Sequence, residues 1–459
     1  MKAVNLKTEY LKNPIGIDIK RPRLFWNCEG GIKQTAYIVS LKKENGTEFW
    51  KSEKILGDKM YFDLPFDLKS RQRVYWNITL FDENGNMGET SETAFFETGL
   101  YKKDWKAEWI TGNYTVNKKH RYPVDCFQKK FAIKKEVEKA RLYIAACGIY
   151  CAVLNGKRFS MPLAPGITDY RRRVQYQTYD IAPMLKRMNT LEIQLADGWY
   201  RGSTGAWGLV NQYGTETKVI AQLEIKYSDG ETKRIVTDGT WAWSNDGEIR
   251  FADNKDGEIV DVRMIPSYRK FARVTSHNVI PTCSNNVPIA EKEAFKPIIS
   301  KTPSGKTLLE FPQDMAGYIS FTVNAKAGEK LKLRFGEMLD EGGELTLKNI
   351  QCANKKKTTP LQKIEYICKD GENKYKTKFA IFGFKYVEVE TDIDLTNADF
   401  TAIAVYSDFE ETGFLKAQMS FSTNLSGQQN GQRKVIAQTC RRTARQGNAT
   451  AGRVMHRSL

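Results

Sequence analysis

Two strand-like runs, FAIFGFKYVEVE at Phe379–Glu390 and FTAIAVYSDFEETG at Phe400–Gly413, decide how this chain is divided. Both alternate apolar and polar residues, with β-branched and aromatic side chains on one side, which is typical of half-buried strands. Similar runs fill the sequence before them. By contrast, the 48 residues from Thr412 to Leu459 contain eight Lys or Arg and no Asp or Glu. The preceding 411 residues carry all 54 acidic groups, so the chain changes character at this junction.

Length and composition predict several folded domains. A chain of 459 residues is too long for one core and predicts about three domains. It is 41% hydrophobic and 12% aromatic, unlike a disordered protein. The net charge is +17, but the tail supplies eight of these charges and the others are scattered without a basic stripe. We therefore expect no nucleic-acid partner.

The cysteines and histidines do not form a recognisable metal-binding motif. The chain has three histidines and no CxxC pair, and of its cysteines only Cys147 and Cys151 are close together. Free thiols in a reducing compartment are the simplest interpretation. The N-terminus lacks the apolar segment of a secretory signal, and no run approaches the length of a membrane span. We expect a cytoplasmic protein with no membrane partner.

Three successive segments read as β-sandwiches. Residues 1–100, 125–265 and 305–410 each hold short alternating strands separated by turn signals such as Asn45-Gly46 and Asn155-Gly156. The spacing in the second segment suits a jelly roll, with one short helix at Ala182–Arg187. The predicted strands are Thr35–Leu41, Met60–Leu64, Val74–Phe81, Thr93–Thr98, Cys126–Ile133, Lys139–Ile144, Ile149–Leu154, Thr190–Leu195, Val219–Tyr227, Thr232–Val236, Tyr318–Asn324, Lys330–Arg334, Lys363–Tyr366, Tyr386–Glu390 and Phe400–Tyr406.

One loop has the composition of a sugar-binding site. LADGWYRGSTGAWG, Leu195–Gly208, gathers an acid, aromatic residues, an arginine and glycines after a strand. Aromatic faces stack on the C–H groups of a sugar, and carboxylate and guanidinium groups bond its hydroxyls. The candidate carbohydrate-binding residues are Asp197, Trp199, Tyr200 and Arg201. The alternative is a structural loop in which Trp199 plugs the sandwich, and the sequence leaves both open.

Other candidate sites are weaker. PGITDYRRRVQYQTYDI, Pro165–Ile181, could form a basic aromatic patch for RNA, but an exposed connection with internal ion pairs is the simpler interpretation. Trp26, Trp50, Tyr75 and Trp76 are predicted to fill the first core, and the triplet Lys355-Lys356-Lys357 reads as a solvated loop. No nucleophile, zinc or phosphate-binding motif occurs. Glycosidase chemistry needs two carboxyl groups in one pocket, and the sequence assigns no such pair. The segment GEMLDEGGEL, Gly336–Leu345, is predicted to be the end of a strand and the turn that follows it.

A family resemblance accounts for these segments together. NPIGIDIKRPRLFW (Asn13–Trp26), WKAEWI (Trp105–Ile110), PGITDYRRRVQYQTYDI, LADGWYRG, DGEIVDVR (Asp256–Arg263), GEMLDEGGEL, FGFKYVEVE and YSDFEETG resemble bacterial α-L-rhamnosidases of glycoside hydrolase family 78, in family order. The resemblance implies a fibronectin type III-like sandwich at 1–104, a sugar-binding jelly roll at 105–300 and a concanavalin-like sandwich at 301–413. Rhamnose-containing glycosides are the implied partners. Some relatives bind rhamnose with calcium in the jelly roll, for which Asp197 is the best candidate here.

The resemblance stops where the family's catalytic (α/α)6 barrel should begin. The family continues with a motif close to PTDCP-x-R-x-ER-x-x-WTGDA, whereas this chain has CRRTARQGNATAGRVMH at Cys440–His456. Read from the third base of each codon, one permitted codon choice encodes PTDCPTRERHRWTGDA, and the same shift around Gln418 gives SNELFNQL, like the family's first barrel helix. We hypothesise a single-base frameshift near Ala417, followed by a disordered basic tail at 414–459. No catalytic residue of the family can then be assigned here. The sequence predicts an inactive, non-catalytic portion of an α-L-rhamnosidase, or alternatively a stand-alone glycan-binding module.

Overall fold

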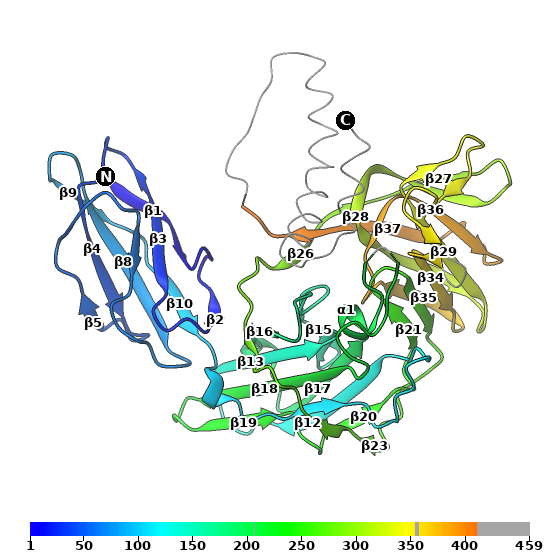
Figure 1. The fold of residues 1–459 in the computed structure, drawn as a ribbon, viewed down its shortest axis with the longest axis horizontal. Coiled ribbons are helices and arrows are strands. Elements are labelled where there is room, and N and C mark those ends of the chain that lie inside the picture. Colours follow the sequence, from blue (N-terminus) through cyan, green and yellow to red (C-terminus); the bar gives the residue numbers. More distant parts are fainter. Residues whose placement is uncertain (206, 354–357, 411–459) are drawn as a thin grey trace, which may run out of the picture.

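The computed structural model describes residues 1–205, 207–353 and 358–410, and almost all regular elements in them are β-strands (Figure 1). The N-terminal domain lies on the left of Figure 1, the jelly-roll domain at the bottom and the third domain at the upper right. The predicted all-β fold with three sandwich-type domains is confirmed, and the described residues contain no helical barrel. The predicted tail at 414–459 and the Lys355–Lys357 loop lie outside the described residues.

The N-terminal domain is a two-layered sandwich. One layer pairs β1, β3 and β7, the other pairs β2, β10, β8 and β4 with the short β5 and β6, and β9 pairs with strands of both. Trp26 and Trp76 are buried in its core as predicted, whereas Trp50 and Tyr75 are half-buried. The strands are β1 (Lys2–Thr8), β2 (Ile15–Ile17), β3 (Arg23–Glu29), β4 (Ala36–Lys42), β5 (Glu48–Lys51), β6 (Ile55–Leu56), β7 (Tyr61–Asp63), β8 (Arg73–Phe81), β9 (Met87–Thr90) and β10 (Ala94–Thr98).

The jelly-roll domain packs two sheets against each other. One sheet runs β24-β11-β18-β13-β16-β25, with β19 on β18, and the other runs β15-β14-β17-β12-β20-β23. Their apolar faces form one core that includes Phe127, Leu223 and Trp241. The strands are β11 (Trp109–Thr111), β12 (Asp125–Ala132), β13 (Val137–Cys147), β14 (Ile149–Leu154), β15 (Lys157–Arg158), β16 (Gln175–Asp180), β17 (Met188–Ala196), β18 (Lys218–Tyr227), β19 (Thr232–Val236), β20 (Ala242–Ser244), β23 (Lys270–Phe271), β24 (Arg273–Thr275) and β25 (Thr282–Cys283).

The predicted helix at Ala182–Arg187 is only one 3-10 turn, η2 (Ala182–Met184). Proline occupies its start, and the chain returns to an extended conformation at Leu185. Because three residues cannot complete an α-helical hydrogen-bond ladder, the segment works as a connection into β17. A second 3-10 turn, η1 (Lys102–Asp104), follows the N-terminal domain. Among the described residues no helix is long and apolar enough to cross a membrane.

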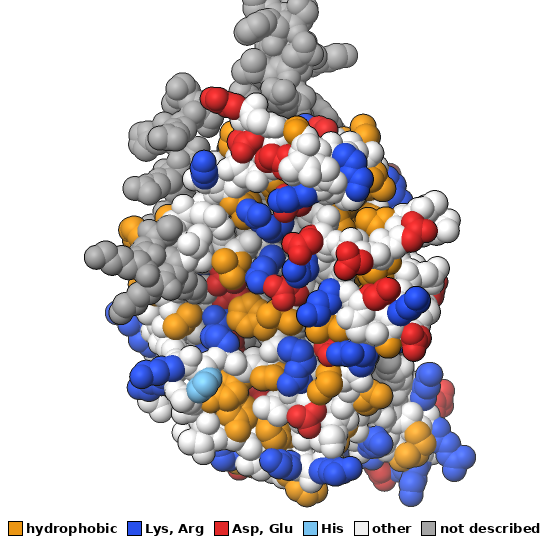
Figure 2. All heavy atoms as spheres, turned by 90° about the vertical axis from the view of Figure 1, so that its right-hand side faces the viewer, with side chains coloured by type: hydrophobic (Ala, Val, Ile, Leu, Met, Phe, Trp, Pro, Cys, Tyr) orange, Lys and Arg blue, Asp and Glu red, His pale blue; other side chains and the backbone are white. Residues whose placement is uncertain are grey.

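The third domain is organised around one long strand, β28, which pairs with β36, β37, β35 and β27. Its core stacks Phe335 on Phe382, with ring centroids 4.1 Å apart. On the face shown in Figure 2, basic and acidic side chains are interspersed over most of the surface. The strands are β26 (Ile289–Phe295), β27 (Ile298–Lys301), β28 (Thr307–Ala325), β29 (Lys330–Gly336), β30 (Met338–Leu339), β31 (Leu345–Thr346), β32 (Cys352–Ala353), β33 (Thr358–Thr359), β34 (Lys363–Ile367), β35 (Gly371–Lys376), β36 (Phe382–Thr391) and β37 (Asp399–Ser407).

A hairpin from the jelly-roll segment of the chain belongs to the sheet of the third domain. It consists of β21 (Ile249–Asp253) and β22 (Gly257–Asp261), and β22 pairs in parallel with β34. A Cβ at Gly257 would lie 1.7 Å from the carbonyl oxygen of Lys363, so the strands meet only because this residue is glycine. The buried Glu258 carboxylate accepts hydrogen bonds from the backbone N–H groups of Phe379 and Ala380. The second and third domains are therefore joined through shared backbone pairing.

The N-terminal domain meets the jelly roll through buried charges. Glu97 in β10 is fully buried and accepts from Arg141 Nε at 2.9 Å, while Lys139 Nζ lies 2.7 Å from its carboxylate. Burial opposes ionisation of Glu97, but the hydrogen bond from Arg141 and the charge of Lys139 outweigh it and hold its pKa below the usual range. This junction relies on side chains rather than on a shared sheet.

Candidate functional site

The loop that follows β17 places all four predicted sugar-binding residues inside the protein. Asp197 precedes a single helical turn, α1 (Gly198–Arg201), in which every residue is buried. The exposed fractions are 3% for Asp197, 7% for Trp199, 5% for Tyr200 and 3% for Arg201. Gly198 has φ +52°, and a Cβ there would lie 2.8 Å from the backbone nitrogen of Ile149, so glycine is needed to start the turn so close to β14.

Asp197 and Arg201 are neutralised within a buried layer of charges. Arg201 Nε donates to Asp197 Oδ1 at 2.6 Å, as the spacing of four residues on one helical turn allows. Arg121 Nε donates to the other oxygen, Oδ2, at 2.8 Å, and its Nη2 donates to Asp253 at 2.8 Å. Burial opposes ionisation of Asp253, but the charge of Arg121 outweighs it and lowers the pKa of this carboxyl. Each guanidinium in this layer has a carboxylate partner.

The same layer continues to Asp125 at the start of β12. Arg201 Nη1 donates to the hydroxyl of Tyr114 at 2.8 Å, and that hydroxyl donates to Asp125 Oδ2 at 3.3 Å. Trp243 Nε1 donates to Asp125 Oδ1 at 2.9 Å. Complete burial raises the pKa of Asp125 to about 6, despite the nearby charge of Arg201 and the bond from Trp243. Burial, followed by the Asp125 charge, raises the pKa of Tyr114.

Trp199 and Tyr200 pack in the core instead of presenting a face to solvent. Both belong to the hydrophobic cluster that extends from the jelly roll into the N-terminal domain. Tyr200 meets Tyr170 edge to face, with centroids 5.2 Å apart and planes at 84°. A Cβ at Gly214 would lie 2.2 Å from the Tyr200 hydroxyl, so the backbone also closes over this ring. Neither ring is free to stack on a sugar in this conformation, and their sugar-binding role stays a prediction.

In the described part of the same loop, the exposed aromatic residue is Trp207, which is not among the four predicted sugar-binding residues. Its exposed fraction is 55%, and Leu209 beside it is 53% exposed. Trp207 lies between Gly205 at φ +65° and Gly208 at φ +58°. Glycines on both sides of a tryptophan were a sequence signal for a tight turn that lifts this side chain away from the core.

Asp197 does not fit a calcium ligand in this arrangement. Both of its carboxylate oxygens accept hydrogen bonds from guanidinium groups. Over the described residues, no group of three or more His, Cys, Asp or Glu side chains is placed to hold a metal ion. The described residues therefore provide no ligand set for the calcium that the family resemblance implies.

The segment Gly336–Leu345 forms the end of β29 and the turn between β30 and β31, as predicted. Burial, and then the charge of Asp314, raise the pKa of Glu337 to about 7, although Asn349 donates to this carboxylate at 2.8 Å. Burial raises the pKa of Asp314 to about 6. The prediction of an exposed connection at Pro165–Ile181 is wrong for most of this segment, because Gln175–Asp180 form β16 and Tyr170 and Tyr176 are buried in the core. The turn before β16 carries the predicted internal ion pair, between Arg171 and Asp169 at 2.8 Å.

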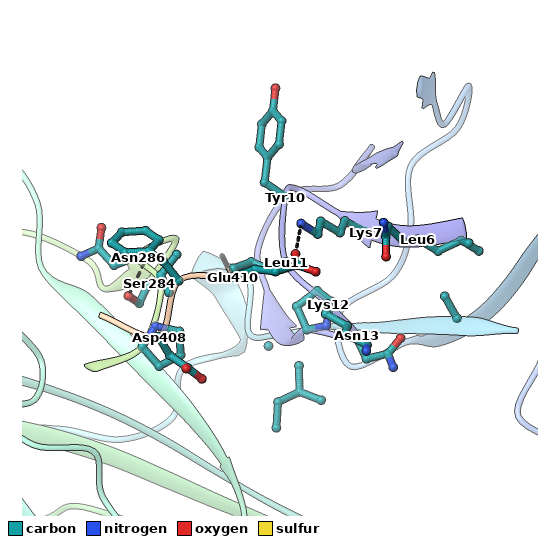
Figure 3. Close-up of a pocket in the computed structure, with 18 of the residues that line it drawn as sticks. Leu6, Lys7, Tyr10, Leu11, Lys12, Asn13, Ser284, Asn286, Asp408 and Glu410 are labelled. Carbon is teal, nitrogen blue, oxygen red and sulfur yellow. Dashed lines mark hydrogen bonds and ion pairs between the residues drawn. The ribbon is translucent and has the colours of Figure 1, made fainter. Parts of the chain in front are cut away.

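A groove of about 1140 Å³ lies where the three domains meet (Figure 3). Tyr10 and Asn13 line it from the N-terminal domain, and Asn286 and Asp408 line it from the other side. The ion pair between Lys7 Nζ and Glu410 Oε2, at 2.7 Å, links the N-terminal domain to the last described residues and is drawn as a dashed line. The groove brings together side chains of both charges.

Three family models match consecutive parts of the chain. The Rha78A-like N-terminal immunoglobulin domain matches residues 3–102, the alpha-L-rhamnosidase N-terminal domain 135–298 and the bacterial alpha-L-rhamnosidase concanavalin-like domain 300–406. The chain belongs to the bacterial α-L-rhamnosidase family. What it shares with this family is the set of N-terminal accessory domains.

Individual relatives agree with this assignment. The chain is 30% identical over 424 residues to an alpha-L-rhamnosidase of Alteromonas sp. (strain LOR), covering 84% of this chain and 45% of the relative. It is 30% identical to one of Formosa agariphila, covering 88% and 47%. The structure of the alpha-L-rhamnosidase from Dictyoglumus thermophilum superposes with a TM-score of 0.84 at 26% identity, covering 95% of this chain and 52% of the other. The chain thus spans about half the length of the rhamnosidases it matches.

Proposed function

We propose that this chain is the non-catalytic N-terminal portion of an α-L-rhamnosidase whose full length hydrolyses terminal α-L-rhamnosyl residues with inversion. The observation that carries the proposal is the ordered match of its three domains to rhamnosidases about twice as long. Inversion requires two carboxyl groups far enough apart to admit a water molecule. We assign no catalytic residue to this chain.

An activity assay tests this proposal. The 459-residue polypeptide is incubated with an aryl α-L-rhamnoside, and release of the aryl group is followed against a blank without protein. We expect no turnover above the blank. Turnover that co-purifies with the folded chain would contradict the proposal, and loss of that turnover in single Asp or Glu variants would then identify the residues responsible.

Glycan binding is the second candidate function, and the exposed Trp207 favours it. A tryptophan face that is open to solvent can stack on a pyranose ring. A structure of the Streptomyces avermitilis alpha-L-rhamnosidase, which shares the fold at 21% identity, is described as complexed with L-rhamnose. Calorimetry with L-rhamnose, in calcium and in EDTA, tests binding by this chain. Trp207→Ala should weaken binding without unfolding, whereas Trp199→Ala should unfold the loop.

The basic tail is explained by a change of reading frame. We propose that translation leaves the family's frame near Ala417, because shifted codons of Cys440–His456 can encode the family's acidic motif. Sequencing the DNA through codons 410–460 tests this directly. The shifted frame should encode PTDCP-x-R and WTGDA strings and then remain open. A stop codon soon after the junction in that frame, or codons that encode other residues, would contradict it.

The proposal also covers the cellular location of the chain and its binding partners. A reducing, cytoplasmic location is supported by the seven described cysteines, all of which are free thiols. Rhamnose-containing glycosides are the proposed partners, and we propose no nucleic-acid partner. Fractionation of the source cells should find the chain in the soluble cytoplasmic fraction, and recovery outside the cytoplasm would contradict this part.

A further inference from the structure

The turn that carries Trp207 is fixed at its base. Thr204 and Leu209 exchange backbone hydrogen bonds of 2.9 and 3.0 Å, and the Thr204 hydroxyl also donates to the Leu209 carbonyl at 3.0 Å. Lys255 Nζ donates to the carbonyl oxygen of Gly205. A Cβ at Gly208 would lie 2.7 Å from Thr359, so the turn also rests on the third domain. The backbone at Thr204, Gly205, Gly208 and Leu209 is therefore held by contacts on several sides.

An exposed tryptophan on a hydrogen-bonded turn is suited to binding by stacking. An aromatic side chain in a preformed position loses little conformational entropy when it meets a ligand. Trp207 and Leu209 leave apolar surface in water that the adjacent core could have buried, as it buries Trp199 and Tyr200. The loop thus buries the aromatic side chains of α1 and leaves that of Trp207 exposed on the turn that follows.

A basic segment lies beside this turn. Asn211 Nδ2 donates to the carbonyl oxygen of Lys118 at 3.3 Å, which joins the turn to residues 117–120. Lys118, Lys119 and His120 are all exposed. No Asp or Glu occurs at positions 111–124 or 198–215, so neither segment supplies a competing negative charge. Arg121, next in sequence, is already paired with buried carboxylates.

We propose that Trp207, Leu209, Lys118, Lys119 and His120, here called the Trp207 rim, bind an acidic saccharide. A pyranose ring stacks on Trp207, and its carboxylate or sulfate group pairs with the ammonium groups of Lys118 and Lys119. The proposal rests on the glycan-binding function above and adds both the place of binding and the charge of the ligand. Surface pairing of this kind weakens with salt, which separates it from stacking alone.

Calorimetry on the full chain with three probes tests the rim: a neutral rhamnan oligosaccharide, a galacturonate–rhamnose oligosaccharide and a sulfated rhamnan oligosaccharide. We expect an acidic probe to bind more tightly than the neutral one at low salt, with the difference shrinking as salt rises. Trp207→Ala should weaken binding of every probe about tenfold. The double variant Lys118→Gln/Lys119→Gln should weaken only the acidic probes, by about fivefold. The two acidic probes distinguish a carboxylate from a sulfate ester.

Tyr10→Ala is the matched control, because Tyr10 is 69% exposed but lines the groove between the domains. Loss of binding in Tyr10→Ala with Trp207→Ala unaffected would overturn the rim and leave glycan binding in place. Equal loss of neutral and acidic probes in the double lysine variant would overturn the charge preference. Absence of binding by the unmodified chain to all three probes would overturn both the rim and the glycan-binding function. Circular dichroism of each variant keeps unfolding separate from loss of binding.

Discussion

The loop at 197–209 has an inner side, residues 197–201, and an outer side, Trp207 and Leu209, and different contacts stabilise each. On the inner side, Asp197 and Arg201 lie in a layer of paired charges and Trp199 lies in the core. On the outer side, Trp207 and Leu209 are exposed above a backbone that is itself fixed. Residues of the same types thus have different roles, because burial makes charges and rings part of the fold while exposure leaves them available to a ligand.

Removing the Asp197 carboxylate should have the largest effect on the inner side. Asp197→Ala leaves Arg121 and Arg201 with unpaired donors in a buried layer, and breaking a buried pair costs about 4 kcal/mol. We expect the free energy of unfolding in urea to fall by about this amount. Asp229→Ala, which removes an exposed partner of Lys135, is the control and should leave the free energy of unfolding almost unchanged. Equal effects would mean that the inner layer is not structural.

The two tryptophans give the most direct contrast in stability. Trp199→Ala should lower the free energy of unfolding by about 4 kcal/mol, because it opens a cavity in the core. Trp207→Ala should change it by less than about 0.5 kcal/mol, because its side chain is mostly in water. Thermal unfolding followed by circular dichroism measures both. A Trp199→Ala variant as stable as the unmodified chain would contradict the structural role of Trp199.

The sequence predicted the strands well because their signal is local. Alternation with a period of two located β14, β18 and β19 to within a residue or two, and Asn155-Gly156 marked the hairpin between β14 and β15. The pairing of β22 with β34 was not predictable, since it joins residues about a hundred positions apart through contacts that leave no periodic pattern. The predicted helix is only the short η2 turn, because a segment this short with proline at its start returns to an extended conformation at Leu185.

The loop at Leu195–Gly208 stood out by its composition, and burial of Trp199 was one of the two alternatives that the sequence left open, but burial of Asp197 and Arg201 was not foreseen. Asp197 and Arg201 carry charges that usually face water, so their burial depends on Arg121, which is far away in sequence and links Asp197 to Asp253. The spacing of four residues between Asp197 and Arg201 was the only local hint of an internal pair. Trp207 was passed over because sequence alone cannot separate a plugging tryptophan from an exposed one.

Asp125 should make the inner layer sensitive to pH. Its pKa rises from 3.8 to about 6 on folding, so the native state holds the proton more tightly than the unfolded state. Stability from this group is therefore greatest below about pH 4 and decreases by about 3 kcal/mol as the pH rises through 6. Urea unfolding of Asp125→Asn against the unmodified chain at pH 4 to 7 measures the difference. Asp125→Asn should gain relative stability as pH rises, and parallel curves would contradict the assignment.

Alanine substitutions at Gly198 on the inner side and Gly205 on the outer side test how strongly the backbone depends on glycine at each place. Gly198→Ala combines a positive φ with contact to Ile149 and should cost about 3 kcal/mol of stability. Gly205→Ala has a similar φ but no atom within 4 Å of the new Cβ, so only about 1 kcal/mol of backbone strain is expected. Chemical denaturation compares the two variants. A larger loss at Gly205 than at Gly198 would reverse the assignment of the inner and outer sides.

Hydrogen–deuterium exchange with and without a galacturonate–rhamnose oligosaccharide tests the central claim, that the outer side of this turn meets the glycan while the inner side holds the fold. The account predicts slower exchange at residues 117–122 and 204–211 when the saccharide is present, with no change at residues 5–13 and 284–288 around the groove. Protection confined to the groove, or none at residues 204–211 under saturating saccharide, would contradict it.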